Sequence, residues 1–169
     1  MRTIGIDPGQ KGALVLLDTD RSLVRAFDIP ITAEKHKTVT KNVVDAVAFN
    51  RILVECAATE AGVFFEDVFS MPSDGHVGAF SFGMNKGALV ALLSGHGCSI
   101  SFVAPSKWKS DLGCTANKKQ TKGVCQRLFP LADKELSNEG KREAALIALW
   151  GLLNSPGWDH TSGMRFAAV

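Results

Sequence analysis

Four acidic residues stand where carboxylates are costly or crowded. Asp7 ends an apolar segment just before Pro-Gly, and Glu66 interrupts the apolar run 63–69. An ionised carboxylate in such surroundings is destabilising unless it is paired or bound to a metal ion. Glu139 and Glu143 are four residues apart in a helical pattern, so they share one helix face. Such a set suits Mg²⁺ or Mn²⁺, and two such ions can assist phosphodiester hydrolysis.

Each acid taken singly also has an ordinary structural interpretation. Asp-Pro-Gly favours a turn that would account for Asp7, and Glu66 could face solvent at a strand end. Glu139 and Glu143 would complement the dipole of a helix that begins after Asn138. The combination favours a metal site, because an acid on the first strand, one on a middle strand and a pair on a late helix can converge.

The segments that must position these acids begin with strand patterns. Residues 2–7 and 12–18 flank Asp-Pro-Gly-Gln-Lys-Gly, which predicts a hairpin. Residues 22–30 predict a third strand, and later strands are predicted at 62–69 and 99–104.

Helical patterns alternate with the later strands, and residues 36–40 indicate an open loop. The predicted helices cover residues 43–59, 79–96, 106–112, 117–129 and 139–154. The later strands must be joined by crossovers and are therefore parallel and right-handed in connection. These patterns together predict an α/β fold with a mixed sheet flanked by helices.

The length and composition limit the class of protein. A chain of 169 residues can bury one core, so we expect a single domain over residues 1–169. Hydrophobic residues make up 46% and charged residues 21%, and we see no apolar run of about 20 residues, which predicts a soluble protein without membrane contact. The acid at position 7 argues against a signal peptide, and we expect a cytoplasmic protein.

The cysteines are too far apart in sequence for the close pairs of a typical zinc site. We expect buried, reduced thiols at Cys56, Cys98, Cys114 and Cys125.

Positive charge is concentrated rather than large, since the net charge is only +2. Residues 105–122 contain five lysines and one acid, Asp111, which predicts a basic stripe. Lysines there and at position 86 could neutralise DNA phosphates or simply be solvated. The candidate DNA contacts are Lys86, Lys107, Lys109, Lys118, Lys119 and Lys122.

Two aromatic residues are candidates for contact with bases. Phe80 and Phe82 follow the polar, Gly-containing segment 73–78. Exposed there, they could wedge against or stack on bases at a branch point. They could equally fasten the following helix onto the sheet, and this structural role is favoured slightly more for Phe82.

The order of these motifs resembles that of the RuvC family of Holliday junction resolvases, and more closely its phage-type branch. The similarity extends over about residues 3–153 and is weakest between residues 19 and 61. The motifs that carry it are residues 4–13, 65–72, 80–87, 103–109, 128–130 and 139–148.

This resemblance implies an RNase H-like fold, with a five-stranded sheet whose first three strands are antiparallel and whose later strands are parallel. It implies a homodimer that cleaves four-way DNA junctions. The helical segment 88–93, which is apolar on several sides, is our own hypothesis for the interface. It also implies two bound Mg²⁺ ions held by Asp7, Glu66, Glu139 and Glu143. The late-helix acids of the family are often Asp, so the ligand of the second ion is less defined here.

Other functions remain open at the level of sequence. The opening Ile-Gly-Ile-Asp is also typical of actin-like ATPases and sugar kinases, but the chain is too short for their two large domains, and it lacks a Walker A loop. A ribonuclease acting on RNA:DNA hybrids would use the same chemistry. A non-catalytic junction-binding module would gain nothing from carboxylates that face phosphate. Residues 155–169 suggest no role.

Overall fold

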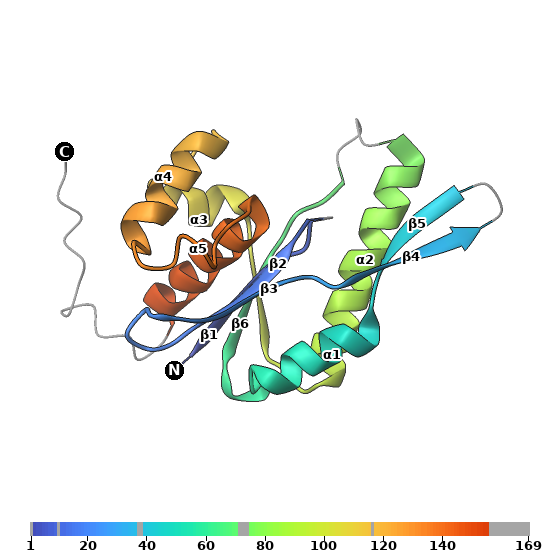
Figure 1. Ribbon diagram of the computed structural model, residues 1–169, viewed down its shortest axis with the longest axis horizontal. Helices are drawn as coiled ribbons and strands as arrows, with labels where there is room; N and C mark the ends of the chain where they lie inside the picture. The colour runs from blue at the N-terminus through green and yellow to red at the C-terminus, as the bar shows by residue number, and fades with distance from the viewer. Residues whose placement is uncertain (1, 10, 37–38, 71–74, 116, 156–169) are drawn as a thin grey trace.

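The chain forms a central sheet with helices on both faces (Figure 1). The computed structural model describes residues 2–9, 11–36, 39–70, 75–115 and 117–155. Residues 156–169, for which the sequence suggests no role, lie outside the described part of the chain.

The sheet has five strands in the order β3-β2-β1-β6-β7. The first three strands pair antiparallel, and β6 and β7 continue the sheet in parallel from β1, which confirms the predicted topology. The strands are β1 (Thr3–Asp7), β2 (Ala13–Leu17), β3 (Leu23–Asp28), β6 (Gly62–Glu66) and β7 (Ile100–Val103).

The strands β1 and β2 are buried on both faces, as expected from the mostly apolar sequence of β1 and the unbroken apolar sequence of β2. Alternate residues therefore enter two separate cores. Val15 packs in the core beneath α5 (Glu139–Asn154), whereas Leu14 and Leu16 pack in the core beneath α1 (Ala46–Glu55) and α2 (Gly75–Gly95).

One face of the sheet is covered by α5, with α3 (Pro105–Asp111) and α4 (Lys118–Leu128) packed around it (Figure 1). Helix α5 lies very close to β1. A Cβ atom at Gly5 would stand 2.0 Å from the Ala144 carbonyl oxygen and 2.4 Å from the Ala148 nitrogen. Only glycine permits this approach, which fixes α5 over the first strand.

The opposite face carries α1 and α2, with a short 3₁₀ helix at Ala58–Glu60. Leu89 and Leu93 anchor α2 in the core, and the other residues of this helix are exposed or only partly buried. In the part of the chain that the structure describes, α2 is one helix that is long and apolar enough to cross a membrane by length and composition alone. The sequence-based statement that no apolar stretch reaches this length is therefore wrong.

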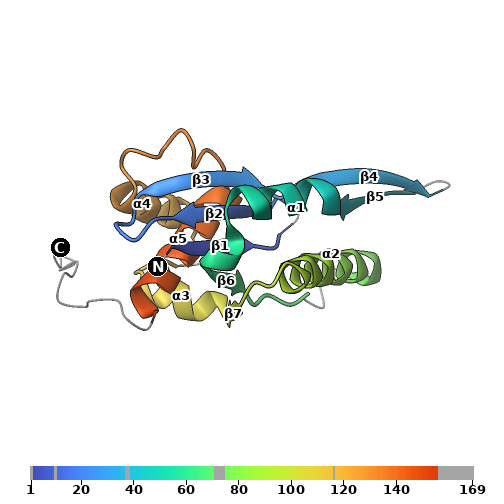
Figure 2. The ribbon, with the colours of Figure 1, turned by 90° about the horizontal axis from the view of Figure 1, so that it is seen from below.

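A second, two-stranded sheet projects beyond the main one, alongside α2 (Figure 2). It consists of β4 (Ile31–His36) and β5 (Val39–Val44), paired antiparallel. The open loop predicted for residues 36–40 is wrong for residues 36, 39 and 40, which lie in these strands, whereas residues 37–38 fall outside the described part.

Several helix limits differ from the predicted ones. Helix α1 begins after Asp45, whose side chain accepts the Ala48 N–H at 2.9 Å, rather than at residue 43. Helix α2 begins at Gly75 instead of residue 79, while α5 has its predicted limits. The cysteines are free thiols, as predicted, and Cys98 is only partly buried.

Candidate active site

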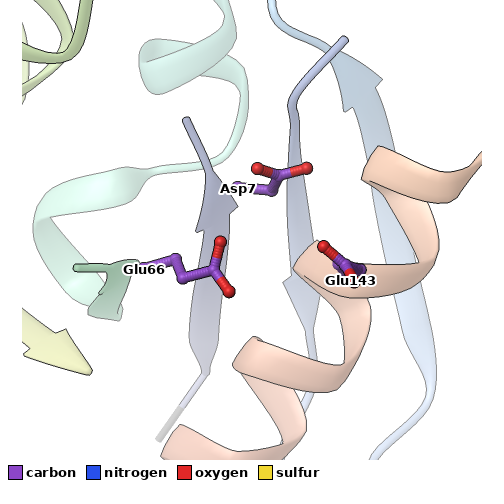
Figure 3. A group of neighbouring side chains, drawn as sticks. All are labelled: Asp7, Glu66 and Glu143. Atoms are coloured by element: carbon purple, nitrogen blue, oxygen red, sulfur yellow. The ribbon is translucent and has the colours of Figure 1, made fainter. Parts of the chain in front are cut away.

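Three of the four predicted acids converge at one edge of the sheet. Carboxylate oxygens of Asp7, Glu66 and Glu143 all lie within 4.8 Å of one another (Figure 3). Asp7 comes from the end of β1, Glu66 from the end of β6, and Glu143 from the second turn of α5. Three carboxylates at such separations repel one another unless a cation lies between them.

Parallel pairing places the first two acids side by side. Ile6 of β1 is in register with Phe65 of β6, so both strands reach their carboxyl ends at the same edge. Each acid is the last residue of its strand. Sequence-distant acids therefore meet because of the sheet topology.

Helix α5 brings the third acid over them by close packing at two glycines. A Cβ atom at Gly140 would lie 2.1 Å from the Lys11 carbonyl oxygen, so the first turn of α5 rests directly on the loop after β1. The contact at Gly5 fixes the next turns of the helix. Glu143 lies between these two contacts and cannot move far from Asp7.

The loop after β1 orients the Asp7 side chain. The Gly9 N–H donates to Asp7 Oδ1 at 2.9 Å, and the Gly12 N–H donates to the Gly9 carbonyl at 2.8 Å. A Cβ atom at Gly12 would stand 2.1 Å from the Asp7 carbonyl oxygen, which explains the glycine. One carboxylate oxygen of Asp7 is thus held, and the other remains available.

Burial makes the negative charges of the site unfavourable in the metal-free chain. It raises the pKa of Asp7 to about 6, with repulsion from Glu143 adding to the effect and the Gly9 hydrogen bond opposing it. Burial likewise raises the pKa of Glu66 to about 7, opposed by a hydrogen bond from Trp108. A bound cation would stabilise the ionised carboxylates and so offset the cost of burying their charge.

Two residues of α3 contact the carboxylates. The buried Trp108 Nε1–H donates to Glu66 Oε1 at 2.9 Å. Lys109 Nζ lies 3.1 Å from Glu143 Oε1 and 4.9 Å from the centre of the Trp108 ring. Helix α3 therefore supplies one group that orients an acid and one positive charge within the cluster.

The fourth predicted acid, Glu139, lies outside the group of three. Its carboxylate pairs with Lys118 Nζ at 3.0 Å, and its side chain is 47% exposed. It nevertheless lines the same cleft, a hollow of about 500 Å³ that also contains Asp7 and Glu143. Glu139 is thus at the rim, one helical turn before Glu143.

The predicted lysines fall into different surroundings. Lys86 is largely buried: it donates to Asp67 Oδ1 at 2.9 Å and to the Val68 carbonyl at 2.8 Å. Lys107 is exposed on α3 and pairs with Asp111 at 3.0 Å. Lys118, Lys119 and Lys122 are exposed on α4 and line a hollow beside Glu139 and Glu143.

The two predicted aromatic contacts also differ. Phe80 is 63% exposed, and Lys41 Nζ lies 5.4 Å from the centre of its ring. Phe82 is partly buried and lines a small cavity with Pro8, Ile29 and Leu89. Both lie within α2.

Sequence reasoning missed two groups beside the acids. Trp108 stands within Pro-Ser-Lys-Trp-Lys, but nothing in the sequence pairs its indole with Glu66. Lys11, in the loop after β1, lines the cleft with Asp7. Its place in the Asp-Pro-Gly-Gln-Lys-Gly turn was the available signal.

The strand order, with three antiparallel strands followed by two parallel ones, defines a mixed α/β fold. Within that class the chain has the fold of RuvC. It matches the Thermus thermophilus RuvC structure in complex with a Holliday junction substrate with a TM-score of 0.64, covering 90% of this chain and 94% of that one at 17% identity. A second T. thermophilus RuvC structure matches with a TM-score of 0.55 and the same identity and coverage.

One relative found by sequence is also a Holliday junction resolvase. The chain is 31% identical over 87 residues to the chloroplastic Holliday junction resolvase MOC1 of Chlamydomonas reinhardtii. That match covers 48% of this chain and only 10% of the length of MOC1. No family model matches the chain.

Proposed function

We propose that this chain is a metal-dependent endonuclease that hydrolyses phosphodiester bonds in four-way DNA junctions. The convergence of Asp7, Glu66 and Glu143 within 4.8 Å on a RuvC fold carries the proposal. The names of the relatives support the choice of substrate, since MOC1 is a Holliday junction resolvase and one RuvC neighbour is bound to a junction.

The donor set fits a hard divalent cation. Carboxylate oxygens are the ligands that Mg²⁺ and Mn²⁺ prefer, and the burial of Asp7 and Glu66 favours a cation that neutralises them. When bound, one or two such ions would activate a water and stabilise the leaving oxygen. Glu139, one turn before Glu143 at the rim, is the candidate further ligand of a second ion.

Residues of the chain would then hold the phosphate and the charges around it. Asp7, Glu66 and Glu143 would bind the cation, with Asp7 oriented by the Gly9 N–H and Glu66 by the Trp108 indole. Lys109, 3.1 Å from Glu143, would lie beside the phosphate and is the candidate group to neutralise one of its oxygens.

The exposed lysines of α4 extend this surface. Lys118, Lys119 and Lys122 lie beside the carboxylates and are positioned to bind the phosphates that flank the cleaved one. Lys107 belongs to the same basic stripe on α3. The position of Lys86 against Asp67 and Val68 supports a structural role for it instead.

We further propose that two copies pair through α2. A four-way junction has approximate two-fold symmetry, and a symmetric dimer would present two active sites to it. Helix α2 exposes an apolar stripe at Val77, Phe80 and Met84, and Cβ atoms at Gly83 and Gly87 would meet nothing within 4 Å. These glycines line a groove of about 610 Å³ beside Phe102, which is 51% exposed. A second helix fits such a surface.

The test uses a synthetic four-way junction, a flap and an RNA:DNA hybrid of matched sequence, each with Mg²⁺ and with EDTA. We expect paired nicks in the junction only when Mg²⁺ is present. Asp7→Asn should bind the junction with the parent affinity and lose nicking by at least about 1,000-fold, since the cation site is incomplete.

Asp133→Asn, which alters an exposed acid between α4 and α5, is the matched control and should cut at the parent rate. Cleavage by Asp7→Asn at the parent rate would disprove the catalytic assignment. Cleavage of the RNA:DNA hybrid alone would contradict the four-way junction as the substrate and would indicate a ribonuclease.

A further inference from the structure

Asp28 is the last residue of β3, and it lies in the same row of the sheet as Asp7. Asp7 is in register with Ala13 of β2, and Ala13 is in register with Asp28. Residues opposite one another in antiparallel strands project from the same face of the sheet. Ala13 packs in the core beneath α5, so both acids lie on the α5 face. Two strand spacings separate their Cα atoms, which amounts to about 10 Å.

The two acids line one cleft, the hollow of about 500 Å³ that also contains Glu143. Pockets for small ligands have volumes of roughly 300–1,000 Å³. Among the described residues that line this cleft, Ile29 is the only one with a large apolar side chain, whereas Lys11 and Lys118 supply positive charge. A cleft of this size and polarity suits one nucleotide of a DNA strand.

Two residues at the start of α5 hold the Asp28 carboxylate in a fixed orientation. Asn138 Nδ2 donates to Asp28 Oδ1 at 2.6 Å, and Lys141 Nζ lies 2.9 Å from Asp28 Oδ2. Asn138 is itself fixed, because its Oδ1 accepts the Lys141 N–H at 2.9 Å as the cap of α5. Each carboxylate oxygen of Asp28 therefore has a partner that restricts its rotation.

The Asp28 carboxylate can still accept further hydrogen bonds. A carboxylate offers about four acceptor positions, and the Asp28 side chain is 59% exposed. Partial burial raises the pKa of Asp28, but the hydrogen bonds from Lys141 and Asn138 together outweigh it and lower the pKa overall. At neutral pH the group is therefore ionised, and it accepts hydrogen bonds without donating any.

We propose that Asp28 recognises the base next to the cleaved phosphate by accepting a hydrogen bond from an exocyclic amino group. Adenine and cytosine present such a group in the major groove and guanine presents one in the minor groove, whereas thymine presents none in either groove. A nucleotide whose phosphate lies at Asp7 would extend across the cleft towards Asp28. The chain would therefore disfavour thymine at this position. The inference rests on the proposed function, because the base belongs to the strand that the acids would cut.

The first test varies the base in single-turnover cleavage of four-way junctions by the full chain with Mg²⁺. The junctions carry each of the four bases on either side of the mapped cleavage point. On one side, thymine should be cut about 10-fold more slowly than the best amino-bearing base, as expected for one hydrogen bond to a charged group. Equal rates for the four bases on both sides would overturn the inference.

The same test identifies the amino group itself. The preferred base is replaced by its analogue without that group, which is 2-pyrimidinone for cytosine, purine for adenine and hypoxanthine for guanine. Cleavage of the analogue should be slower by about the same factor of 10. An analogue that is cut as fast as the preferred base would overturn the inference.

The second test asks whether the Asp28 carboxylate causes the preference. Asp28→Ala should cut the preferred base and its analogue at equal rates. Asp28→Asn, whose neutral oxygen accepts a hydrogen bond more weakly, should show an intermediate ratio of the two rates. A loss of stability slows both substrates alike and leaves this ratio unchanged, so the ratio separates recognition from a structural role.

Lys141→Gln is the matched control, because it removes the ion pair with α5 and leaves the Asp28 carboxylate in place. It should keep the parent ratio of the two rates. A parent ratio in both Asp28 variants would overturn the inference. A ratio that Lys141→Gln loses as completely as Asp28→Ala would also overturn it, since the contact with α5 would then cause the preference.

The two proposals can fail separately. If the parent cuts four-way junctions without a preference for any base, the Asp28 proposal fails and the endonuclease proposal stands. If the parent cuts no four-way junction with Mg²⁺, both proposals fail. A preference that disappears in Asp28→Ala while cleavage persists supports both.

Discussion

Helices α5 and α2 lie on opposite faces of one sheet and are both largely apolar, yet only α5 is buried by the rest of the chain. Both are long and apolar on nearly every side, without a clear polar face. Helix α5 is covered by the sheet, α3 and α4, and most of its residues are buried. Helix α2 buries only Leu89 and Leu93. An apolar helix that its own chain leaves exposed indicates a partner, whereas a covered one indicates a rigid scaffold.

The glycines on the two sides of the sheet show the same difference between a covered helix and an exposed one. On the α5 face, Gly5 and Gly140 have no room for a side chain, and their close packing positions Glu143. On α2, Gly83 and Gly87 have open space around them. The first pair serves the internal packing, and the second pair is free to serve an external surface.

The largest expected effect follows from this contrast. Gly5→Ala places a methyl group against backbone atoms of α5 and should lower the free energy of unfolding by about 3 kcal/mol or more. Gly83→Ala should raise it by up to about 1 kcal/mol, because alanine favours the helix. Urea unfolding at a concentration where the chain is monomeric measures both. Equal effects of the two substitutions would contradict the packing difference.

The buried acids on the α5 side predict that the stability of the metal-free chain depends on pH. The pKa values of Asp7 and Glu66 are raised to about 6 and about 7, so the metal-free native state holds these protons more tightly than the unfolded chain. Stability from this source is present at low pH and is lost as the pH rises from about 4 to about 7. Asp7→Asn removes the charge and keeps an acceptor for the Gly9 N–H. In EDTA it should match the parent near pH 4 and exceed it by about 3 kcal/mol at pH 8.

Thermal unfolding across this range, with Asp133→Asn as the control, measures the effect. A constant difference between Asp7→Asn and the parent at every pH would show that burial does not raise the pKa of Asp7. Saturating Mg²⁺ should reverse the order at pH 8, because only the parent retains the complete acid cluster.

Two tryptophans provide a matched comparison of orienting roles. Trp108 donates to the buried Glu66, whereas Trp150 donates to Asp111 at 2.7 Å, outside the acid cluster. Trp108→Phe should weaken Mn²⁺ binding by about 10- to 100-fold, as expected when a group that orients a ligand is removed. Trp150→Phe should not change it. Titration followed by electron paramagnetic resonance separates this effect from stability, and equal Mn²⁺ affinities in both variants would refute the role of Trp108.

If two copies pair through α2, a substitution on this helix should weaken the dimer. Gly87→Leu fills the groove beside Phe102 without a clash inside the chain. It should weaken dimerisation by at least about 10-fold, which corresponds to about 1.4 kcal/mol. Sedimentation velocity over a range of concentrations measures the dimer. A parent chain that stays monomeric at micromolar concentrations without DNA would count against pairing through α2.

The sequence predicted the main sheet well and the exposed hairpin poorly, for a physical reason. Strands β1, β2 and β6 enter a core, so their apolar runs reveal them. Strands β4 and β5 mix polar and apolar residues, and Ile31 to Lys35 of β4 are exposed on both faces, so burial imposes no period of two. The start of α2 was missed because Gly75–Gly78 contains two glycines, which helices tolerate without favouring.

The acid cluster was predictable in outline and not in detail. The last residues of adjacent parallel strands must meet, which brings Asp7 to Glu66. Glu139 and Glu143 share a helix face, but Gly140 lets the first turn rest on Lys11, and Glu139 is left at the rim with Lys118. Spacing gives the common face of two residues; only the packing of the helix shows which of them reaches the other acids.

The most direct test of the account is Mn²⁺ binding by the parent chain and by a variant that combines Asp7→Asn, Glu66→Gln and Glu143→Gln. Electron paramagnetic resonance of free Mn²⁺ during titration counts the bound ions and gives their affinity. We predict that the parent binds at least one ion and that the triple variant loses this site while remaining folded. Equal Mn²⁺ binding by the two proteins would contradict the claim that these three carboxylates form a metal centre.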